Sequence, residues 1–309
     1  MNIRRIARLI KNAVTDPKLR FGYLSKLGVF NRMSDEEYLK KVFQLHMGKE
    51  LDLENPKTFN EKLQWLKLYD QRPEYTKMVD KYAVKKLVAE MIGEEYIIPT
   101  LGVWNRFEDI DFDALPDQFV LKCTHDSGGL AICRDKNTFD FDKAKKVISK
   151  SLKQNYYWKW REWPYKDVPP RIIAEKYMQD EETGELRDYK FFCFNGEAKA
   201  LFIATERQKE NEEVKFDFFD MAFNHLDVRQ GHPNAKICPE KPKQFDEMRM
   251  LAEVLSKNIP QLRVDFYEVN GKVYFGELTF SHFAAIVPFE PESWDRVLGD
   301  MIILQERCI

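Results

Sequence analysis

Hydrophobic and polar positions divide the chain into a helical first part and a strand-rich remainder. Up to about Tyr96, apolar residues recur at helical spacing between polar ones. Thr58 with Glu61 forms a capping box, and Ser34 followed by acidic residues marks the start of another helix. A third helix is expected over residues 80–91. We therefore expect a helical N-terminal region.

Beyond this region, runs of strand-forming residues alternate with helical patterns. The Asn195-Gly196 and Asn270-Gly271 pairs lie between such runs and predict type I′ hairpin turns. The mixture predicts an α+β class, with antiparallel sheets half covered by helices. Strands are expected within residues 119–134 (a hairpin), 171–178, 188–194, 197–205, 262–269 and 272–280, and helices over residues 140–156, 243–258 and 292–304.

Charge and cysteine content exclude several classes of function. The chain of 309 residues has 49 basic and 51 acidic side chains, so no overall charge attracts nucleic acid, and we expect no nucleic-acid partner. The five cysteines contain no Cys-x-x-Cys pair and show no zinc-ligand spacing. Their odd number favours reduced thiols and a cytoplasmic location.

Membrane contact is expected only at the N-terminus. No apolar stretch approaches the length of about 18 residues that a spanning helix needs, and no apolar signal-peptide core is present. Residues 2–14 form a short basic amphipathic pattern. Such a helix lies on an anionic membrane, here the inner face, or docks on its own protein, and both interpretations stay open.

The stretch FVLKCTHDSGG places Lys122 inside an apolar strand, directly before a glycine-rich turn. A buried ammonium needs a negative partner. Glycines let backbone N–H groups approach phosphate oxygens, and Thr124, His125 and Ser127 offer further donors. A phosphate site and a plain hairpin are both compatible with this stretch.

Carboxylates gather on one face of the last predicted hairpin. Arg263 and Asp265 share a strand face, as do Glu277 and Thr279 on the following strand. With a turn at Asn270-Gly271, Asp265 and Glu277 come roughly opposite each other, where two oxygen donors could share Mg²⁺. The alternative is a solvated sheet face with a salt bridge.

A third pattern is RIIAEKYM followed by RDYKFF. Glu175 lies in an apolar strand that continues through Lys176 and Met178, which suits the edge of an adenine ring. Asp188 and Lys190 share a strand face downstream. Surface charges beside a core strand would give the same pattern.

The order of these blocks resembles the ATP-grasp fold. NPKTFNEKLQWLKLYD, DKYAVKK, FVLKCTHDSGG, RIIAEKYM, DYKFFCFNGEAKAL and RVDFY with GKVYFGELTFSHFAAIVPFEPESWD are similar to the TupA-like ATP-grasp proteins of surface-polysaccharide loci. The resemblance covers roughly residues 35–300. It implies two α+β subdomains that clamp ATP, after a helical N-terminal region. The implied divisions are residues 1–96, residues 97–180 for the small subdomain, and residues 181–309 for the large subdomain.

The resemblance also implies ATP and Mg²⁺ as cofactors and a role for each candidate residue. One departure is Thr279, which stands where most ATP-grasp enzymes have asparagine, so a second fully bound metal ion is in doubt. The implied phosphate contacts are Lys122, Lys190, the turn from Thr124 through His125, Ser127 and Gly128 to Gly129, and Lys85 as a helper; the adenine and ribose contacts are Glu175, Lys176, Met178 and Asp188; the metal ligands are Asp265, Glu277 and Thr279; and the catalytic residues are Arg263 and Lys190.

The activity implied by the resemblance is an ATP-dependent carboxylate–amine ligase acting through an acylphosphate. Its partners would be a small-molecule or glycan-linked carboxylate and an amine, in a uronic acid or peptide component of a cell-surface polysaccharide. A phosphotransferase on a sugar or polyol, and a non-catalytic nucleotide-binding protein of a glycan assembly complex, are the alternatives. The aromatic run at residues 156–165 suits either a sugar ring or the protein core.

Overall fold

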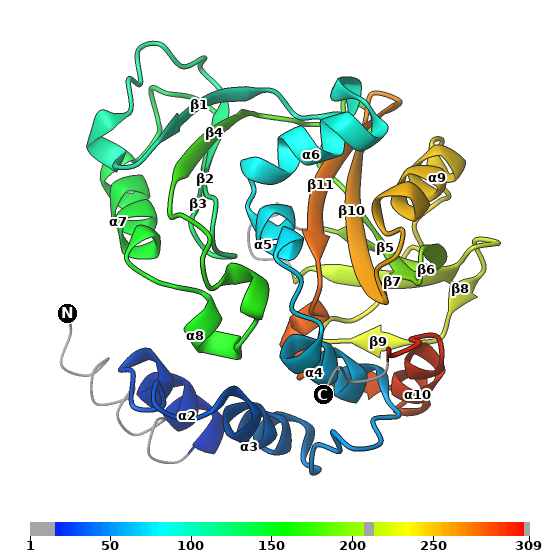
Figure 1. The fold of residues 1–309 in the computed structure, drawn as a ribbon. Coiled ribbons are helices and arrows are strands. Elements are labelled where there is room, and N and C mark those ends of the chain that lie inside the picture. Colours follow the sequence, from blue (N-terminus) through cyan, green and yellow to red (C-terminus); the bar gives the residue numbers. More distant parts are fainter. Residues whose placement is uncertain (1–15, 207–212, 306–309) are drawn as a thin grey trace.

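The computed structural model describes residues 16–206 and 213–305, in which two antiparallel β-sheets lie side by side (Figure 1). The first sheet has the strand order β1-β4-β2-β3, and the second has the order β11-β10-β5-β6-β7-β8. Helices pack on both sheets. This architecture confirms the predicted α+β class.

The first sheet is built from strands between residues 100 and 176. Helix α7 (Phe141–Leu152) covers it, and its Ala144 and Ile148 join the core that includes Leu121. The first strand was not predicted, because Gly102 interrupts the apolar pattern; the pairing with β4 is irregular at this point. The strands are β1 (Thr100–Trp104), β2 (Phe119–Cys123), β3 (Leu130–Cys133) and β4 (Ile172–Lys176).

The second sheet contains the two hairpins that the Asn-Gly pairs predict. Asn195 and Asn270 have φ values of 53° and 51°, and the following glycines are also left-handed, as type I′ turns require. Both hairpins are confirmed. The strands are β5 (Asp188–Phe194), β6 (Glu197–Thr205), β7 (Lys215–Asp220), β8 (His225–Leu226), β10 (Gln261–Val269) and β11 (Lys272–Thr279).

Helices cover both faces of the second sheet. On one face, α6 (Ala83–Ile92) and α9 (Phe245–Leu255) bury Val88 and Met248 in the largest apolar core. On the other face, α4 (Phe59–Tyr69) and α10 (Ser293–Asp300) form a second core. The N-terminal helices α4 and α6 thus belong to the cores of this sheet, so they are not a separate layer.

Capping side chains fix the N-terminal helices. Both predicted capping boxes are present, from Ser34 at α3 (Asp35–Met47) and from Thr58 at α4. The predicted helix over residues 80–91 begins later, because the Asp80 carboxylate accepts hydrogen bonds from the amides of Tyr82 and Ala83.

Short elements complete the described chain. The predicted boundary at residue 180 falls in the loop between the two sheets, and the division into domains stays a prediction. Residues 2–14, with their basic amphipathic pattern, lie outside the described residues. The remaining elements are α2 (Pro17–Lys26), α5 (Glu74–Val79), α8 (Tyr157–Trp160), η1 (Glu94–Tyr96), η2 (Phe107–Asp109), η3 (Trp163–Tyr165), η4 (His282–Ala285), β9 (Arg229–Gln230) and β12 (Phe289–Glu290).

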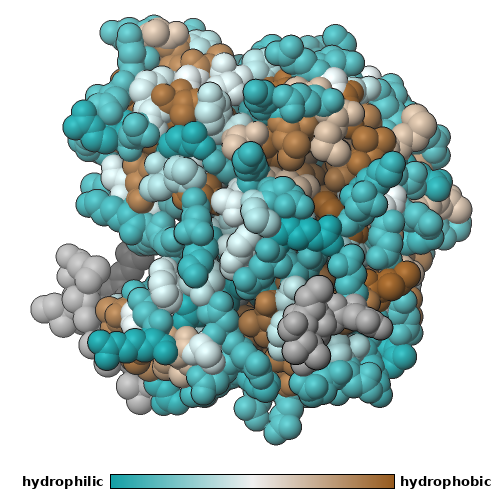
Figure 2. All heavy atoms as spheres, viewed as in Figure 1, coloured by the Kyte–Doolittle hydropathy of each residue, from teal (hydrophilic) through white to brown (hydrophobic). Residues whose placement is uncertain are grey.

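The face of the molecule seen in Figure 2 is mostly hydrophilic, with smaller hydrophobic areas between polar ones. Among the helices of residues 16–206 and 213–305, none is long and apolar enough to cross a bilayer.

Candidate active site

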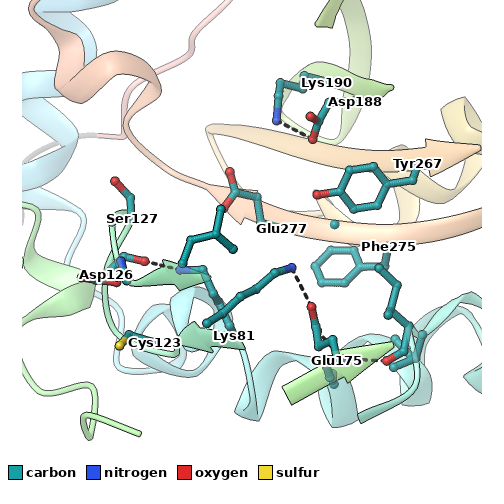
Figure 3. A pocket seen from close by; sticks show the side chains of 18 residues that line it. Lys81, Cys123, Asp126, Ser127, Glu175, Asp188, Lys190, Tyr267, Phe275 and Glu277 are labelled. Carbon is teal, nitrogen blue, oxygen red and sulfur yellow. Dashed lines mark hydrogen bonds and ion pairs between the residues drawn. The ribbon is translucent and has the colours of Figure 1, made fainter. Parts of the chain in front are cut away.

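A cavity of about 230 Å³ lies between the two sheets (Figure 3). One wall comes from α6, β2 with its glycine turn, and β4; the other comes from β5, β10 and β11. Because both signs of charge line the same space, the cavity can hold an anion together with a cation. Its charged lining residues are Lys81, Lys85, Lys122, Lys190, Asp126, Glu175, Asp188 and Glu277.

Glu175 lies between two lysines in one wall of this cavity. Its Oε1 is 2.5 Å from Lys85 Nζ, and its Oε2 is 2.6 Å from Lys122 Nζ. Burial alone would raise the pKa of Glu175, but the ammonium groups of Lys122 and Lys85 outweigh it and lower the pKa to about 2. The lysine in strand β2 is therefore neutralised by the neighbouring strand β4, and it still lines the cavity.

The glycine turn between β2 and β3 is held by Asp126. This carboxylate accepts a hydrogen bond from the Gly129 amide at 3.1 Å and another from the Ser151 hydroxyl, while Lys81 donates to the Asp126 carbonyl. A Cβ built on Gly129 would overlap side-chain atoms of Ser151 and Cys123. The turn thus needs glycine at this position for packing as well as for access to a ligand.

Two of the predicted donors in this turn do not line the cavity. The Thr124 hydroxyl donates to the carbonyl of Pro169 at 3.1 Å. Nε2 of His125 lies 3.1 Å from the carbonyls of both Ser151 and Gln154, so it donates to them. Thr124 and His125 are both buried, and they attach the turn to its surroundings. Ser127, Gly128 and Gly129 do line the cavity.

Asp265 is fully buried, and its carboxylate accepts hydrogen bonds from two cationic side chains. Lys190 lies opposite it on β5 and donates to its carboxylate. Arg263 adds hydrogen bonds from Nε at 2.7 Å and from Nη2 at 2.8 Å. Burial lowers the pKa of Lys190, while the charge of Asp265 opposes this effect. Lys190 also donates to Asp188 at 3.2 Å, so it links Asp188 on its own strand with Asp265 on β10.

Asp265 and Glu277 are cross-strand partners in β10 and β11. The Asn270-Gly271 turn alone would set Asp265 opposite Gly276, and an irregularity in the pairing between Asp265 and Phe266 brings Glu277 to this position. Arg263 Nη2 bridges the second strand, since it donates to Glu277 Oε1 at 3.0 Å and to Thr279 Oγ1 at 2.9 Å. Both the carboxylate pair and the salt bridge of the alternative interpretation are thus present. Glu277 lines the cavity, whereas both oxygens of Asp265 accept hydrogen bonds from Arg263 and Lys190. A Mg²⁺ ion bound by both carboxylates would share Asp265 with these cations and take further oxygen ligands from phosphates and water.

Protein ligands alone would not complete such a site. Within residues 16–206 and 213–305, no group of three or more His, Cys, Asp or Glu side chains is arranged to hold a metal ion. The Thr279 hydroxyl is already engaged by Arg263. The donor set therefore fits a magnesium ion that arrives with a phosphate ligand.

His282 forms a buried hydrogen bond with Arg263. Arg263 Nη1 lies 2.7 Å from His282 Nδ1. Burial, with the nearby charges of Arg263 and Lys190, lowers the pKa of His282 well below its ordinary value, so the ring is neutral. Because a guanidinium can only donate, Nδ1 accepts this hydrogen bond and the proton lies on Nε2.

The two remaining adenine candidates lie at one edge of the site. Met178 is buried in a small apolar cluster with Ile98, and Tyr267 packs against the same cluster. Ile98 and Tyr267 also line the cavity, so Met178 supports its wall. The Lys176 side chain is exposed, whereas its backbone amide donates to the Pro99 carbonyl at 3.0 Å.

Sequence reasoning missed three features of the cavity. Lys81 and Asp126 line it, as do the rings of Tyr267 and Phe275 from the β10–β11 hairpin. Two sequence features could have indicated them: the Asp80-Lys81 pair just before α6, and Asp126 within the glycine turn. Phe275 is itself part of the buried core and Tyr267 follows the buried Phe266, so the strand pattern did not mark either ring as a cavity residue.

Two larger sheets with a lysine-lined cavity between them are features expected of an ATP-grasp protein. The family model of TupA-like ATP-grasp proteins matches residues 61–303, so the chain belongs to the TupA-like ATP-grasp family. A search of curated proteins found no match.

Several solved structures are similar in part. D-alanine–D-alanine ligase from Bacillus anthracis with bound ATP is 16% identical, with 73% of this chain and 63% of that chain covered and a TM-score of 0.41. The ATP-grasp ligase PsnB with its minimal precursor, Mg and ADP is 10% identical, with 72% and 57% covered and a TM-score of 0.39. The matching region thus spans less than two thirds of either protein. Similarity at this level does not extend to a substrate.

Proposed function

We propose that this protein is an ATP-dependent carboxylate–amine ligase that acts through an acylphosphate on a uronic acid or peptide component of a cell-surface polysaccharide. One observation carries the proposal. A single cavity has Lys81, Lys85 and Lys122 in one wall and Glu277 in the facing wall, and the buried Asp265 behind that wall is the cross-strand partner of Glu277. Lysines suit a polyphosphate chain, and the carboxylate pair suits the magnesium ion that accompanies it.

Each part of the cavity has a role in this proposal. Lys81 and Lys122 contact the phosphates, and the backbone amides at Gly128 and Gly129 approach phosphate oxygens that a side chain would block. Asp265 and Glu277 hold Mg²⁺, which supplies positive charge to the phosphoryl oxygens. The wall formed by Glu175, Lys176 and Met178 receives the adenine, with Asp188 near the ribose.

The reaction needs no covalent intermediate with the enzyme. A substrate carboxylate oxygen attacks the γ-phosphorus, and ADP leaves with the electron pair of the broken P–O bond. The amine then attacks the acyl carbon, and phosphate leaves. Arg263, with Lys190 beside it, offsets the negative charge that develops during transfer. Closure of the glycine turn would keep water from the acylphosphate.

The fate of the γ-phosphorus tests this proposal. With a panel of uronic acids, amino acids and simple amines, we expect ADP and inorganic phosphate in equal amounts, and a hydroxamate when hydroxylamine replaces the amine. A product heavier by one phosphate, with no phosphate released, would instead support a phosphotransferase on a sugar or polyol. If no compound of the panel leads to ADP release, the result would support a non-catalytic nucleotide-binding role in glycan assembly.

A further inference from the structure

The aromatic segment, which we define as residues 156–165, comprises α8 and η3, and α8 lies between the first sheet and the helices α2 and α3 (Figure 1). At its start, the Tyr156 side chain reaches Ser127 of the glycine turn. Near its end, Trp163 shares a small cavity with Phe280 and Ser281, which directly follow β11. The segment therefore connects the turn expected over the phosphates with the strand that carries Glu277.

Arg161 anchors this segment to the N-terminal helices. Its φ of 52° is left-handed, which is uncommon for a residue with a side chain, and its guanidinium is almost fully buried. It stacks over Tyr38 and Trp158, each at 4.6 Å, and donates to the Phe30 carbonyl at 2.8 Å. These contacts fix the backbone immediately before Glu162.

Glu162 is buried and has no direct partner. Only 4% of this residue is exposed. In the part of the chain that the structure describes, no side chain or amide lies within hydrogen-bond or ion-pair distance of its carboxylate. Its oxygens are also absent from the fully enclosed polar atoms that lack a partner, so they keep some contact with solvent. A carboxylate in this state is costly unless a ligand uses it.

Lys67, the cation with the largest effect on Glu162, donates its hydrogen bonds elsewhere. Lys67 of α4 donates to the carbonyls of Ala284 at 2.8 Å and Trp160 at 3.2 Å. Its ammonium offsets the charge of Glu162 through space without forming a contact ion pair. Lys67 thus partly stabilises the buried charge of Glu162 while its own hydrogen bonds go to backbone carbonyls, so the carboxylate oxygens can still bind a ligand.

Charged groups on several elements surround Glu162. Burial raises the pKa of Glu162 to about 7, against the lowering effect of Lys67, Lys159 and Arg263. An acid with a pKa near neutral pH can both accept and release a proton under working conditions. The groups that interact electrostatically with it are Lys67 from α4, Tyr156 at the start of α8, Lys159 from α8, Tyr165 from η3, Arg263 from β10 and Glu277 from β11.

We propose that Glu162 receives the attacking amine of the acceptor and takes its proton, so that the region between the aromatic segment and the β10–β11 hairpin is an amine-binding site. This inference rests on the proposed ligase function. An ammonium ion satisfies the carboxylate that the protein leaves without a partner. The charge of Glu162 acts on Tyr156 and Tyr165, whose ring centroids are 4.9 Å apart.

The proton transfer balances with the ligase reaction. The acceptor arrives as R–NH₃⁺ and gives one proton to the Glu162 carboxylate, which leaves R–NH₂ with a free electron pair. That pair forms the bond to the acyl carbon of the acylphosphate. The C–O bond to phosphate breaks, phosphate leaves with its electrons, and the second nitrogen proton is carried away on the phosphate. Glu162 returns its proton to solvent before the next cycle.

Hydroxylamine provides the decisive comparison, because it is uncharged near neutral pH and needs no base. With the carboxylate that releases most ADP in the panel, the amide-forming rate is measured with glycine, glutamate and ethanolamine, and hydroxamate formation is measured alongside. In Glu162→Gln we expect the amide-forming rate to fall by about 10² to 10³, with hydroxamate formation within about threefold of the original protein. Glu162→Asp should recover part of the lost rate.

Asp167→Asn, which changes an exposed acid just beyond the segment, is the matched control and should match the original protein in both assays. The inference is overturned if Glu162→Gln forms the amide at the original rate. It is equally overturned if amide and hydroxamate fall together, since Glu162 would then be a structural partner of Lys67. Failure of the ligase function itself looks different, because the unchanged protein would yield neither hydroxamate nor free phosphate.

Discussion

The ammonium group of Lys122 lies 2.6 Å from a carboxylate oxygen of Glu175 on the neighbouring strand. This contact explains how an apolar strand tolerates a lysine, since the charge is neutralised within the same sheet. Because Lys85 occupies the other oxygen of Glu175, the two lysines are held together at the wall of the cavity. A bound polyphosphate would therefore contact two ammonium groups that Glu175 already holds in position.

Replacing Lys122 should weaken nucleotide binding. We expect Lys122→Met to reduce the affinity for ATP by about 1.5 to 3 kcal/mol, the scale of one hydrogen bond to a charged group. Lys122→Arg should not restore it, because the planar guanidinium fork is wider than an ammonium. Calorimetric titration measures the change, and Lys86→Met, on the exposed face of α6, is the control. Equal affinities in all variants would return Lys122 to a structural role.

The Glu175 ion pairs should stabilise the fold in a pH-dependent way. The pKa of Glu175 falls from an ordinary 4.5 to about 2 in the folded protein, so its contribution is fully present above about pH 5 and is lost as the pH falls toward 2. A difference of this size corresponds to about 3 kcal/mol. Urea unfolding of Glu175→Gln and the original protein should differ most near neutral pH. A difference that stays constant down to pH 3 would contradict this account.

Asp265 and Glu277 should both be essential for ATP turnover but should differ in stability. Asp265→Asn removes the charge that Lys190 and Arg263 share in a buried site, so we expect a loss of about 3 to 5 kcal/mol in the free energy of unfolding. The Glu277 side chain is 41% exposed, and Glu277→Gln should cost about 1 kcal/mol or less. Denaturant unfolding and ADP release at saturating Mg²⁺ measure the two effects. Turnover that survives both changes would remove the metal site.

The adjacent glycines of the turn offer a matched pair of variants. A Cβ on Gly129 would overlap side-chain atoms of Ser151 and Cys123, whereas the nearest atom to a Cβ on Gly128 is 4.0 Å away. Gly129→Ala should therefore lower both the thermal midpoint and ATP turnover, because the turn must move. Gly128→Ala should leave the midpoint unchanged. A similar midpoint for both alanine variants would show that the turn adjusts without strain.

Local sequence determined the elements and the positions of the hairpin turns. Alternation places Arg263 and Asp265 on one face, and the Asn270-Gly271 turn fixes the pairing as far as Phe266 and Phe275. The pairing of Asp265 with Glu277 depends on the irregularity next to Asp265, which the turn does not predict. Capping residues likewise fixed the starts of α3 and α4. Such features depend on residues a few positions apart, and for that reason they are readable from the sequence.

Only the tertiary structure decided which side chains share a space. Thr124 and His125 belong to the glycine turn in sequence, yet both are attached to the surrounding protein, whereas Lys81 reaches the cavity from before a distant helix. Glu162 comes within the influence of Arg263 and Glu277 although about 100 residues separate it from them. The physical reason is that side-chain direction in an irregular turn depends on packing against remote segments, and no local period records that packing.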